Sequence, residues 1–124
     1  MQISREPRSA VTVRHVAPGE IRIGQQTLTH NVVVTPDHDI RDWPTDDVGQ
    51  LGQNDVDRLL AMQPEMVVLG TGFRPVAPPR EVVFAFARRG IGFESMTTPA
   101  ACRTFNILAQ EERRAAAVLI INEP

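Results

Sequence analysis

The second half of the chain alternates apolar runs with helical segments, and this order limits the fold more than any other feature. Residues 66–69 and 115–121 are unbroken apolar runs, and residues 91–96 form a third predicted strand. Continuous apolar runs are typical of strands that are covered on both faces. A helix is predicted in each gap between these strands. Since strand–helix–strand crossovers are right-handed, the three strands are predicted to be parallel, in a βαβαβ unit.

Proline, glycine and threonine mark the ends of the two helices in this unit. Pro78-Pro79 opens the first helix, because proline is tolerated at the first helical position. Gly90 follows that helix, where glycine allows the left-handed turn that closes many helices. Thr98 is the predicted N-cap of the second helix. The apolar residues that repeat along the helices are Val82, Val83 and Phe86 in the first, and Ala101, Phe105 and Leu108 in the second.

An antiparallel meander is predicted before the parallel unit. Residues 10–16 and 20–23 are short strand candidates on either side of a Pro18-Gly19 turn. Residues 27–35 alternate in polarity, and we expect them to form one strand with one buried face. The predicted fold class is therefore α/β, with an N-terminal antiparallel meander and a C-terminal βαβαβ parallel unit.

Residues 36–53 are predicted to form a loop between the two halves. Aspartates in this loop could supply oxygen ligands to a divalent cation, but the spacing lacks the glycine and terminal glutamate of an EF-hand. We therefore expect a solvated acidic loop and assign no metal site.

Trp43, in the same loop, is either a buried ring that pins the loop to the body, or an exposed anchor for a partner. Asn54 is the predicted N-cap of a helix that ends near Met62.

The size and composition of the chain exclude several classes of function. Its 124 residues predict a single domain, 1–124. A net charge of -2 lacks the basic excess of a nucleic-acid-binding surface, so no nucleic-acid partner is expected. All 13 basic residues are arginine, and there is no tyrosine. A P-loop lysine, a Schiff-base lysine and a tyrosine general acid are therefore excluded. No cofactor is expected.

Neither a membrane span nor a secretion signal is expected. The longest apolar run, residues 115–121, is too short to cross a bilayer. Residues 1–10 are polar, unlike a signal peptide. The one cysteine, Cys102, cannot form an internal disulfide, which fits a reducing compartment. We therefore expect a cytoplasmic protein.

Two loops are predicted to meet at the carboxyl edge of the parallel strands, where open α/β sheets bind ligands. They form a candidate crevice of residues 70–75 and 97–103. The first loop, Gly70-Thr71-Gly72, either approaches an anion or a partner chain, or only makes a turn that needs a positive φ. It lacks the third glycine of a dinucleotide fingerprint. In the second loop, the free N–H groups of a helix start could bind an anion with Arg103 as a clamp, or Thr98 simply caps the helix.

Two further side chains of the crevice have both a reactive and a structural interpretation. Cys102, in the first helical turn, is either a stabilised thiolate or, as we expect, a buried inert thiol. Glu94 is expected to be partly buried, and it either acts as a base or pairs with Arg74 or Arg103. The residues of the candidate crevice are Gly70, Thr71, Gly72, Arg74, Glu94, Thr98, Ala100, Ala101, Cys102 and Arg103.

Motifs in this half of the chain resemble those of one small protein family. They are Leu69-Gly70-Thr71-Gly72, Pro78-Pro79, Arg89-Gly90-Ile91-Gly92-Phe93-Glu94 and residues 98–109. The family includes short bacterial and archaeal proteins, the mitochondrial respiratory complex I assembly factor three and the adipogenesis-associated protein of animals. The resemblance implies a three-layer α/β fold with mixed sheets and no established catalytic activity. It also implies binding to assembly proteins, which is how the eukaryotic relative acts at a membrane.

Two positions depart from the pattern of this family. Glu111-Glu112-Arg113 stands where a glycine precedes the arginine, so the turn into the last strand is expected to be built differently. Leu28 stands where an aromatic side chain is common.

Two functions are compatible with these features. The preferred one is a non-catalytic protein-interaction or assembly-type module. Its expected partners are other proteins, and a homo-oligomer of the chain itself is one option. It predicts an exposed apolar patch and no strongly perturbed titratable group. The alternative is a binder of, or an enzyme acting on, a small anionic ligand at the crevice of residues 70–75 and 97–103. It predicts a concave pocket where Arg103, Glu94 and backbone donors converge.

Overall fold

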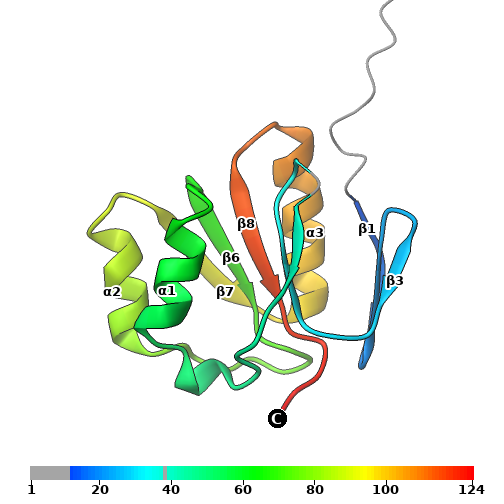
Figure 1. Cartoon of the computed structure of the whole chain (residues 1–124), viewed down its shortest axis with the longest axis horizontal. Coiled ribbons are helices and arrows are strands. Elements are labelled where there is room, and N and C mark those ends of the chain that lie inside the picture. Colours follow the sequence, from blue (N-terminus) through cyan, green and yellow to red (C-terminus); the bar gives the residue numbers. More distant parts are fainter. Residues whose placement is uncertain (1–11, 38) are drawn as a thin grey trace, which may run out of the picture.

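Two sheets and three helices make up the part of the chain that the computed structural model describes, residues 12–37 and 39–124 (Figure 1). The smaller sheet has the strand order β1-β2-β3, and the larger sheet has the order β5-β4-β8-β6-β7. The elements are β1 (Val13–Ala17), β2 (Glu20–Ile23), β3 (Gln26–Leu28), β4 (Val32–Val34), β5 (Ile40–Asp42), a 3-10 turn (Val48–Gln50), α1 (Gln53–Leu60), β6 (Met66–Gly70), α2 (Arg80–Ala87), β7 (Gly92–Met96), α3 (Thr98–Gln110) and β8 (Ala115–Leu119).

The predicted α/β class, meander and parallel unit are confirmed. Strand β6 pairs in parallel with both β7 and β8. Strands β1, β2 and β3 pair in antiparallel order. The larger sheet is mixed, because β4 joins β8 in antiparallel orientation. This pairing places the carboxyl end of β4 beside the amino end of β8, which matters for the site described below.

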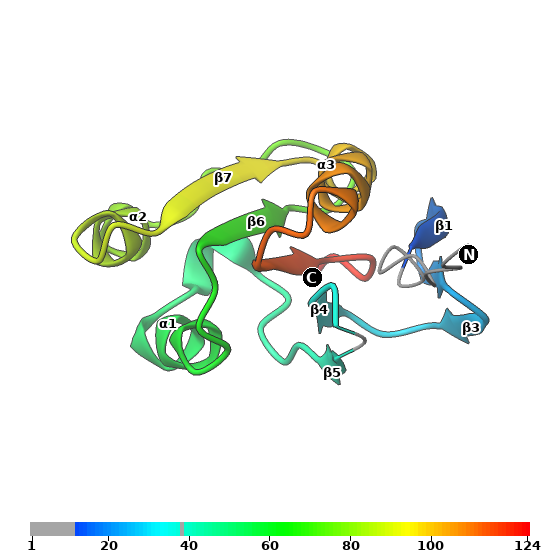
Figure 2. The ribbon, with the colours of Figure 1, turned by 90° about the horizontal axis from the view of Figure 1, so that it is seen from above.

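Two hydrophobic layers cover the opposite faces of the larger sheet, as Figure 2 shows for α3 and α1. On one face, Phe105 of α3 and Ile21 of β2 pack in a core with Ala117. On the other face, Phe86 of α2 packs with Val118. Neighbouring residues of β8 therefore pack in different layers, since successive side chains along a strand point to opposite faces of the sheet. Burial on both faces explains why the strand sequence is continuously apolar.

The single strand predicted for residues 27–35 is wrong. Within this segment, β3 ends at Leu28 and β4 begins at Val32, and the two strands belong to different sheets. All three residues of β4 are buried, because β4 is an inner strand with both faces covered. Asn31 lies in the connection between the two sheets. Its side chain forms hydrogen bonds with residues 121 and 122. These bonds to residues about ninety positions later in the chain interrupt the predicted strand at Asn31.

The predicted structure of residues 36–53 and of the next helix start also needs correction. The loop contains β5, which pairs with β4. Helix α1 has Gly52, not Asn54, as its N-cap. The Gly52 N–H donates to the carboxylate of Asp55 at 2.9 Å, and the Thr45 hydroxyl donates to the same carboxylate at 2.7 Å. An acidic residue at the third helical position therefore caps α1.

The turn from α3 into β8 is an ordinary Schellman turn, so the expectation of a different construction is wrong. The Arg113 N–H donates to the Leu108 carbonyl at 3.0 Å, and the Glu112 N–H donates to the Ala109 carbonyl at 3.1 Å. Glu112 has φ 60°, in the left-handed region where glycine is usual. The glutamate thus adopts the conformation of the glycine that it replaces.

Candidate functional site

The two loops of the predicted crevice lie side by side and are hydrogen-bonded to each other. The Thr98 N–H donates to the Gly72 carbonyl at 2.7 Å, and the Gly72 N–H donates to the Thr98 hydroxyl at 2.8 Å. The same hydroxyl donates to the Ile120 carbonyl at 2.7 Å. The N-cap of α3 is Thr97 rather than Thr98. Thr98 is fully buried (0%), and its hydroxyl joins two loops instead of capping a helix.

Two different constraints favour glycine at the two glycines of the first loop: close packing at Gly70 and a positive φ at Gly72. A Cβ at Gly70 would lie 2.9 Å from the Thr98 hydroxyl, closer than side chains normally approach. Gly72 has φ +102°, and a Cβ there would overlap the carboxylate of Glu123. That carboxylate accepts the Phe73 N–H at 2.7 Å. The turn interpretation with positive φ is therefore correct for Gly72, and an acidic group of the chain itself bonds to this loop.

The helix start offers fewer free donors than expected. The Ala101 N–H donates to the Thr97 carbonyl at 2.9 Å, and the Thr98 N–H is used by Gly72. Pro99 has no N–H. The expectation of a free donor is therefore wrong for Ala101, and Ala100, beside it, is half-buried.

The charged residues assigned to the crevice do not converge. Glu94, Arg74 and Arg103 are all exposed, and none of them makes an ion pair within the described residues. Glu94 lies on β7, an edge strand of the sheet, so the expected partial burial is wrong. The Arg74 carbonyl accepts the Thr71 hydroxyl at 2.9 Å, and this bond closes the first loop.

Cys102 is a buried thiol, as expected. It lies in the core under α3 with 4% of its surface exposed. Burial raises its pKa to about 12, and the nearby charge of Arg103 lowers it only in part. A strongly shifted group is present, contrary to what the interaction module predicts. The direction of its shift favours the protonated, unreactive thiol.

Trp43 lies inside the protein rather than on its surface. Its side chain is 4% exposed and belongs to the core that α1 and α2 cover. Its backbone N–H donates to the Asn31 carbonyl at 2.8 Å. The indole N–H has no hydrogen-bond partner among the described residues. The ring therefore pins the loop to the body, and the exposed-anchor interpretation is wrong.

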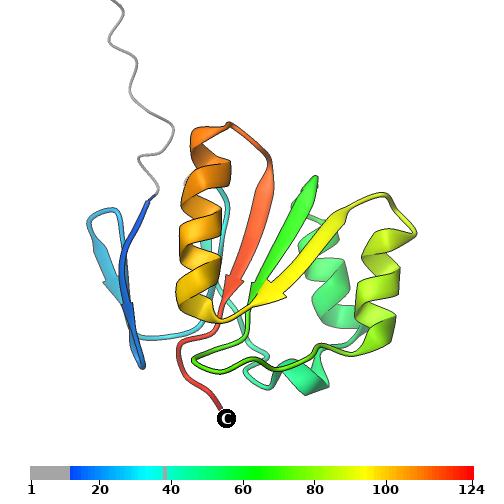
Figure 3. The ribbon, with the colours of Figure 1, turned by 180° about the vertical axis from the view of Figure 1, so that it is seen from behind.

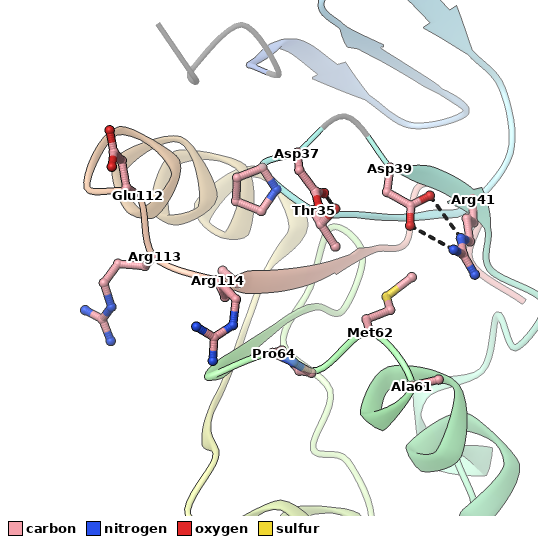
Figure 4. Close-up of a pocket in the computed structure, with 12 residues that line it drawn as sticks. Thr35, Asp37, Asp39, Arg41, Ala61, Met62, Pro64, Glu112, Arg113 and Arg114 are labelled. Atoms are coloured by element: carbon pink, nitrogen blue, oxygen red, sulfur yellow. Dashed lines mark hydrogen bonds and ion pairs between the residues drawn. The ribbon is translucent and has the colours of Figure 1, made fainter.

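A hollow of about 390 Å³ lies at the opposite end of the sheet, at the carboxyl end of β4 and the amino end of β8 (Figure 4). We call it the three-loop hollow, because the β4–β5, α1–β6 and α3–β8 connections enclose it. Sequence reasoning missed it, since no motif links these three loops. The lining residues are Thr35, Pro36, Asp37, Asp39, Arg41, Ala61, Met62, Pro64, Glu112, Arg113, Arg114 and Ala115.

Three of the charged side chains around the three-loop hollow, Asp39, Arg41 and Arg113, form ion pairs. Arg41 contacts the Asp39 carboxylate twice, at 2.9 Å each, and this pairing raises the pKa of Arg41. Arg113 contacts Glu65 at 3.3 Å and points away from the other lining side chains in Figure 4. The hollow is therefore ringed by charges of both signs.

The aspartates considered as metal ligands have other contacts. The Asp42 carboxylate lies 2.8 Å from His30, and the Asp47 carboxylate accepts the Gly49 N–H at 3.0 Å. Within residues 12–37 and 39–124, no three acidic, histidine or cysteine side chains gather in a metal-binding arrangement. Over the same residues, no helix has the length and apolar character needed to cross a membrane.

The fold defines the class of the protein as α/β, with a mixed sheet covered by helices on both faces and a small antiparallel sheet beside it. The family described as "Protein of unknown function (DUF498/DUF598)" matches residues 13–120, and the chain belongs to this family. A Xanthomonas campestris protein of known solution structure has a TM-score of 0.81 and 35% sequence identity to it. That alignment covers 98% of this chain and 92% of the Xanthomonas chain.

Two curated relatives show what kinds of protein the chain is similar to. One is the "13 kDa major membrane protein" of Francisella tularensis, 32% identical over 75 residues, or 60% of this chain and 61% of that protein. The other is "NADH dehydrogenase [ubiquinone] 1 alpha subcomplex assembly factor 3" of Danio rerio, 50% identical over 62 residues, or 50% of this chain and 36% of that protein. The chain thus aligns with about a third to three fifths of the length of these relatives.

Proposed function

We propose that the protein is a protein-interaction module that takes part in the assembly of a larger complex. The similarity to the assembly factor carries this proposal, since 62 residues aligned at 50% identity indicate common descent. The name of that relative makes a respiratory NADH dehydrogenase the first complex to examine. The proposal includes a cytoplasmic location, which is supported by the single cysteine, kept as a free thiol.

Two exposed apolar side chains support a docking role. Phe84 on α2 is 52% exposed, and Ile107 on α3 is 56% exposed. These helices flank β7, which lies at the edge of the sheet (Figure 3). The two side chains lie on helices that cover opposite faces of the sheet, so each would be a separate contact point for a partner chain. The outer edge of β7 offers unpaired backbone groups as a further contact.

The small-ligand alternative receives less support from the geometry. It needs Arg103 and Glu94 to converge with free backbone donors, whereas the Thr98 and Ala101 N–H groups already bond to the Gly72 and Thr97 carbonyls. The crevice loops are instead joined by their own hydrogen bonds through Thr98.

Affinity purification from the source cell after brief crosslinking tests the proposal. The tagged wild-type chain is expected to recover a fixed set of partner proteins in stoichiometric amounts. Ile107→Glu and Phe84→Glu should reduce that set, because a charge at a buried contact is costly. Gln110→Glu, an exposed change on the same helix as Ile107, is the matched control and should keep it. Recovery of the wild-type chain without a stoichiometric partner would contradict the proposal.

A further inference from the structure

Hydrogen bonds connect the segments that line the three-loop hollow. The Glu65 N–H and Met66 N–H both donate to the Arg114 carbonyl, at 2.8 and 3.3 Å. The Arg114 Nε donates to the Gln63 carbonyl at 3.2 Å, so its guanidinium is anchored to the α1–β6 connection. On the other side, the Thr35 N–H donates to the Asp39 carbonyl at 3.0 Å and closes the turn after β4. These bonds join the start of β8 to the α1–β6 connection and join Thr35 to Asp39.

Asp37 and Arg114 carry opposite charges on the rim of this hollow, both are exposed, and neither has a charged partner within the described residues. Asp37 accepts the Thr35 hydroxyl, and Arg114 donates to a neutral carbonyl. Among the described residues, no ion pair joins the two. Figure 4 shows them on different loops of the hollow. The remaining Arg114 N–H groups match a carboxylate in shape and charge. The Asp37 carboxylate has the opposite charge to an ammonium group and can accept its hydrogen bonds.

The lining of the hollow is mixed, and its apolar part comes from five residues, Pro36, Ala61, Met62, Pro64 and Ala115. Pro64 and Ala115 are buried in it, and Pro36 and Met62 are half-buried. The Met62 side chain extends toward Asp39 and Arg41 in Figure 4. A volume of about 390 Å³ is near the lower end of the size range of small-molecule sites. The hollow thus has room for a small ligand with an apolar body.

We propose that the three-loop hollow binds a small zwitterion of the amino-acid or short-peptide class, with its carboxylate on Arg114 and its ammonium group on Asp37. A simple anion would be repelled by Asp37, and a simple cation would be repelled by Arg114. A ligand with both charges satisfies both groups, and its side chains contact Met62 and the prolines. This binding goes beyond the proposed assembly role and does not depend on it.

Titration with leucyl-leucine, followed by backbone amide NMR shifts, tests this site. Saturating shifts are expected at Met62, Arg114 and Ala115 in the millimolar range. N-acetyl-leucyl-leucine lacks the ammonium group and leucyl-leucinamide lacks the carboxylate. Each should bind about tenfold or more weakly, because each loses a charge-assisted hydrogen bond. Free leucine, titrated in parallel, separates an amino-acid site from a peptide site by which of the two binds more tightly.

Substitutions provide the second half of the test. Arg114→Gln and Asp37→Asn should each weaken leucyl-leucine binding about tenfold, whereas Arg103→Gln, an exposed change on α3 outside the hollow, should leave it unchanged. Amide shift dispersion shows whether each variant is folded, and the capped peptides test the wild-type chain directly. Capped peptides that bind as tightly as the zwitterion, or no saturating shifts at the hollow, would overturn the proposal.

Discussion

The side chain of Asn31 accepts the backbone N–H of Ile121 at 2.7 Å, and this bond joins the connection between the two sheets to the segment after β8. The same oxygen accepts the Asn122 N–H at 2.8 Å, and the Asn31 amide donates to the Asn122 carbonyl at 3.2 Å. Asn31 is 8% exposed. One buried side chain therefore satisfies three backbone groups of the last segment.

Replacing Asn31 with alanine should lower the free energy of unfolding by about 2–3 kcal/mol, because buried backbone groups lose their partners. Asn54→Ala is the matched control, since Asn54 is exposed and does not cap α1. It should change stability by less than about 0.5 kcal/mol. Urea denaturation of both variants measures the difference, and equal effects would contradict this role of Asn31.

Thr98 should matter more for stability than its neighbour Thr97. Thr98→Val keeps the shape of the side chain but leaves the Gly72 N–H without its acceptor. The expected loss is about 2–3 kcal/mol in the free energy of unfolding. Thr97→Val is the control, because the Thr97 side chain makes no capping hydrogen bond. If the two valine variants are equally stable, the hydroxyl bridge does not contribute as described.

Glu112→Gly should stabilise the protein by about 0.5–1 kcal/mol, since glycine adopts the left-handed conformation without a steric penalty. Glu111→Gly is the control at the adjacent position, where φ is -84° and glycine brings no such relief. Thermal unfolding of both variants measures the effect. A loss of stability in both would show that left-handed strain at Glu112 is not the dominant factor.

Cys102 should make the stability of the protein fall at alkaline pH. Its folded pKa is raised from 9.0 to about 12 by burial, so between these values the unfolded thiol ionises while the folded thiol stays protonated. The unfolded state is then favoured, and stability should decrease by up to about 1.4 kcal/mol per pH unit. The chain has no lysine or tyrosine, whose titration would otherwise overlap this range.

Denaturant unfolding at several pH values from about 9 to 11 measures this slope. Cys102→Ala should be less stable at neutral pH, because a buried side chain is truncated, but its stability should not decline in the same way with pH. The same decline in both proteins would show that another group is responsible.

The predictable parts of the fold are those that local patterns encode. The apolar runs at residues 66–69 and 115–121 predict parallel strands covered on both faces, and the structure has the inner strands β6 and β8 there. Two errors have a different origin, because they depend on partners that are distant in sequence. Asn31 ends a strand through bonds to residues about ninety positions later. The Thr98 hydroxyl does not cap α3, because it bonds to Gly72 and Ile120 instead.

The candidate site was less predictable than the fold. Sequence reasoning correctly placed the loops of Gly72 and Thr98 side by side, but it could not show that Thr98 fills the space between them. The three-loop hollow depends on β4 pairing with β8, which brings Asp37 to the same hollow as Arg114. Because these two residues are 77 positions apart in the chain, no local sequence motif indicates that they line the same hollow.

The most direct test of the proposed assembly role is deletion of the gene in its source organism, followed by native gel electrophoresis of the membrane complexes. The proposal predicts less mature NADH dehydrogenase and an accumulation of partial complexes. Expression of the wild-type chain should restore the mature complex, as should expression of the Gln110→Glu control. An unchanged amount of mature complex, with normal NADH oxidation and no partial complexes of any respiratory enzyme, would contradict the account.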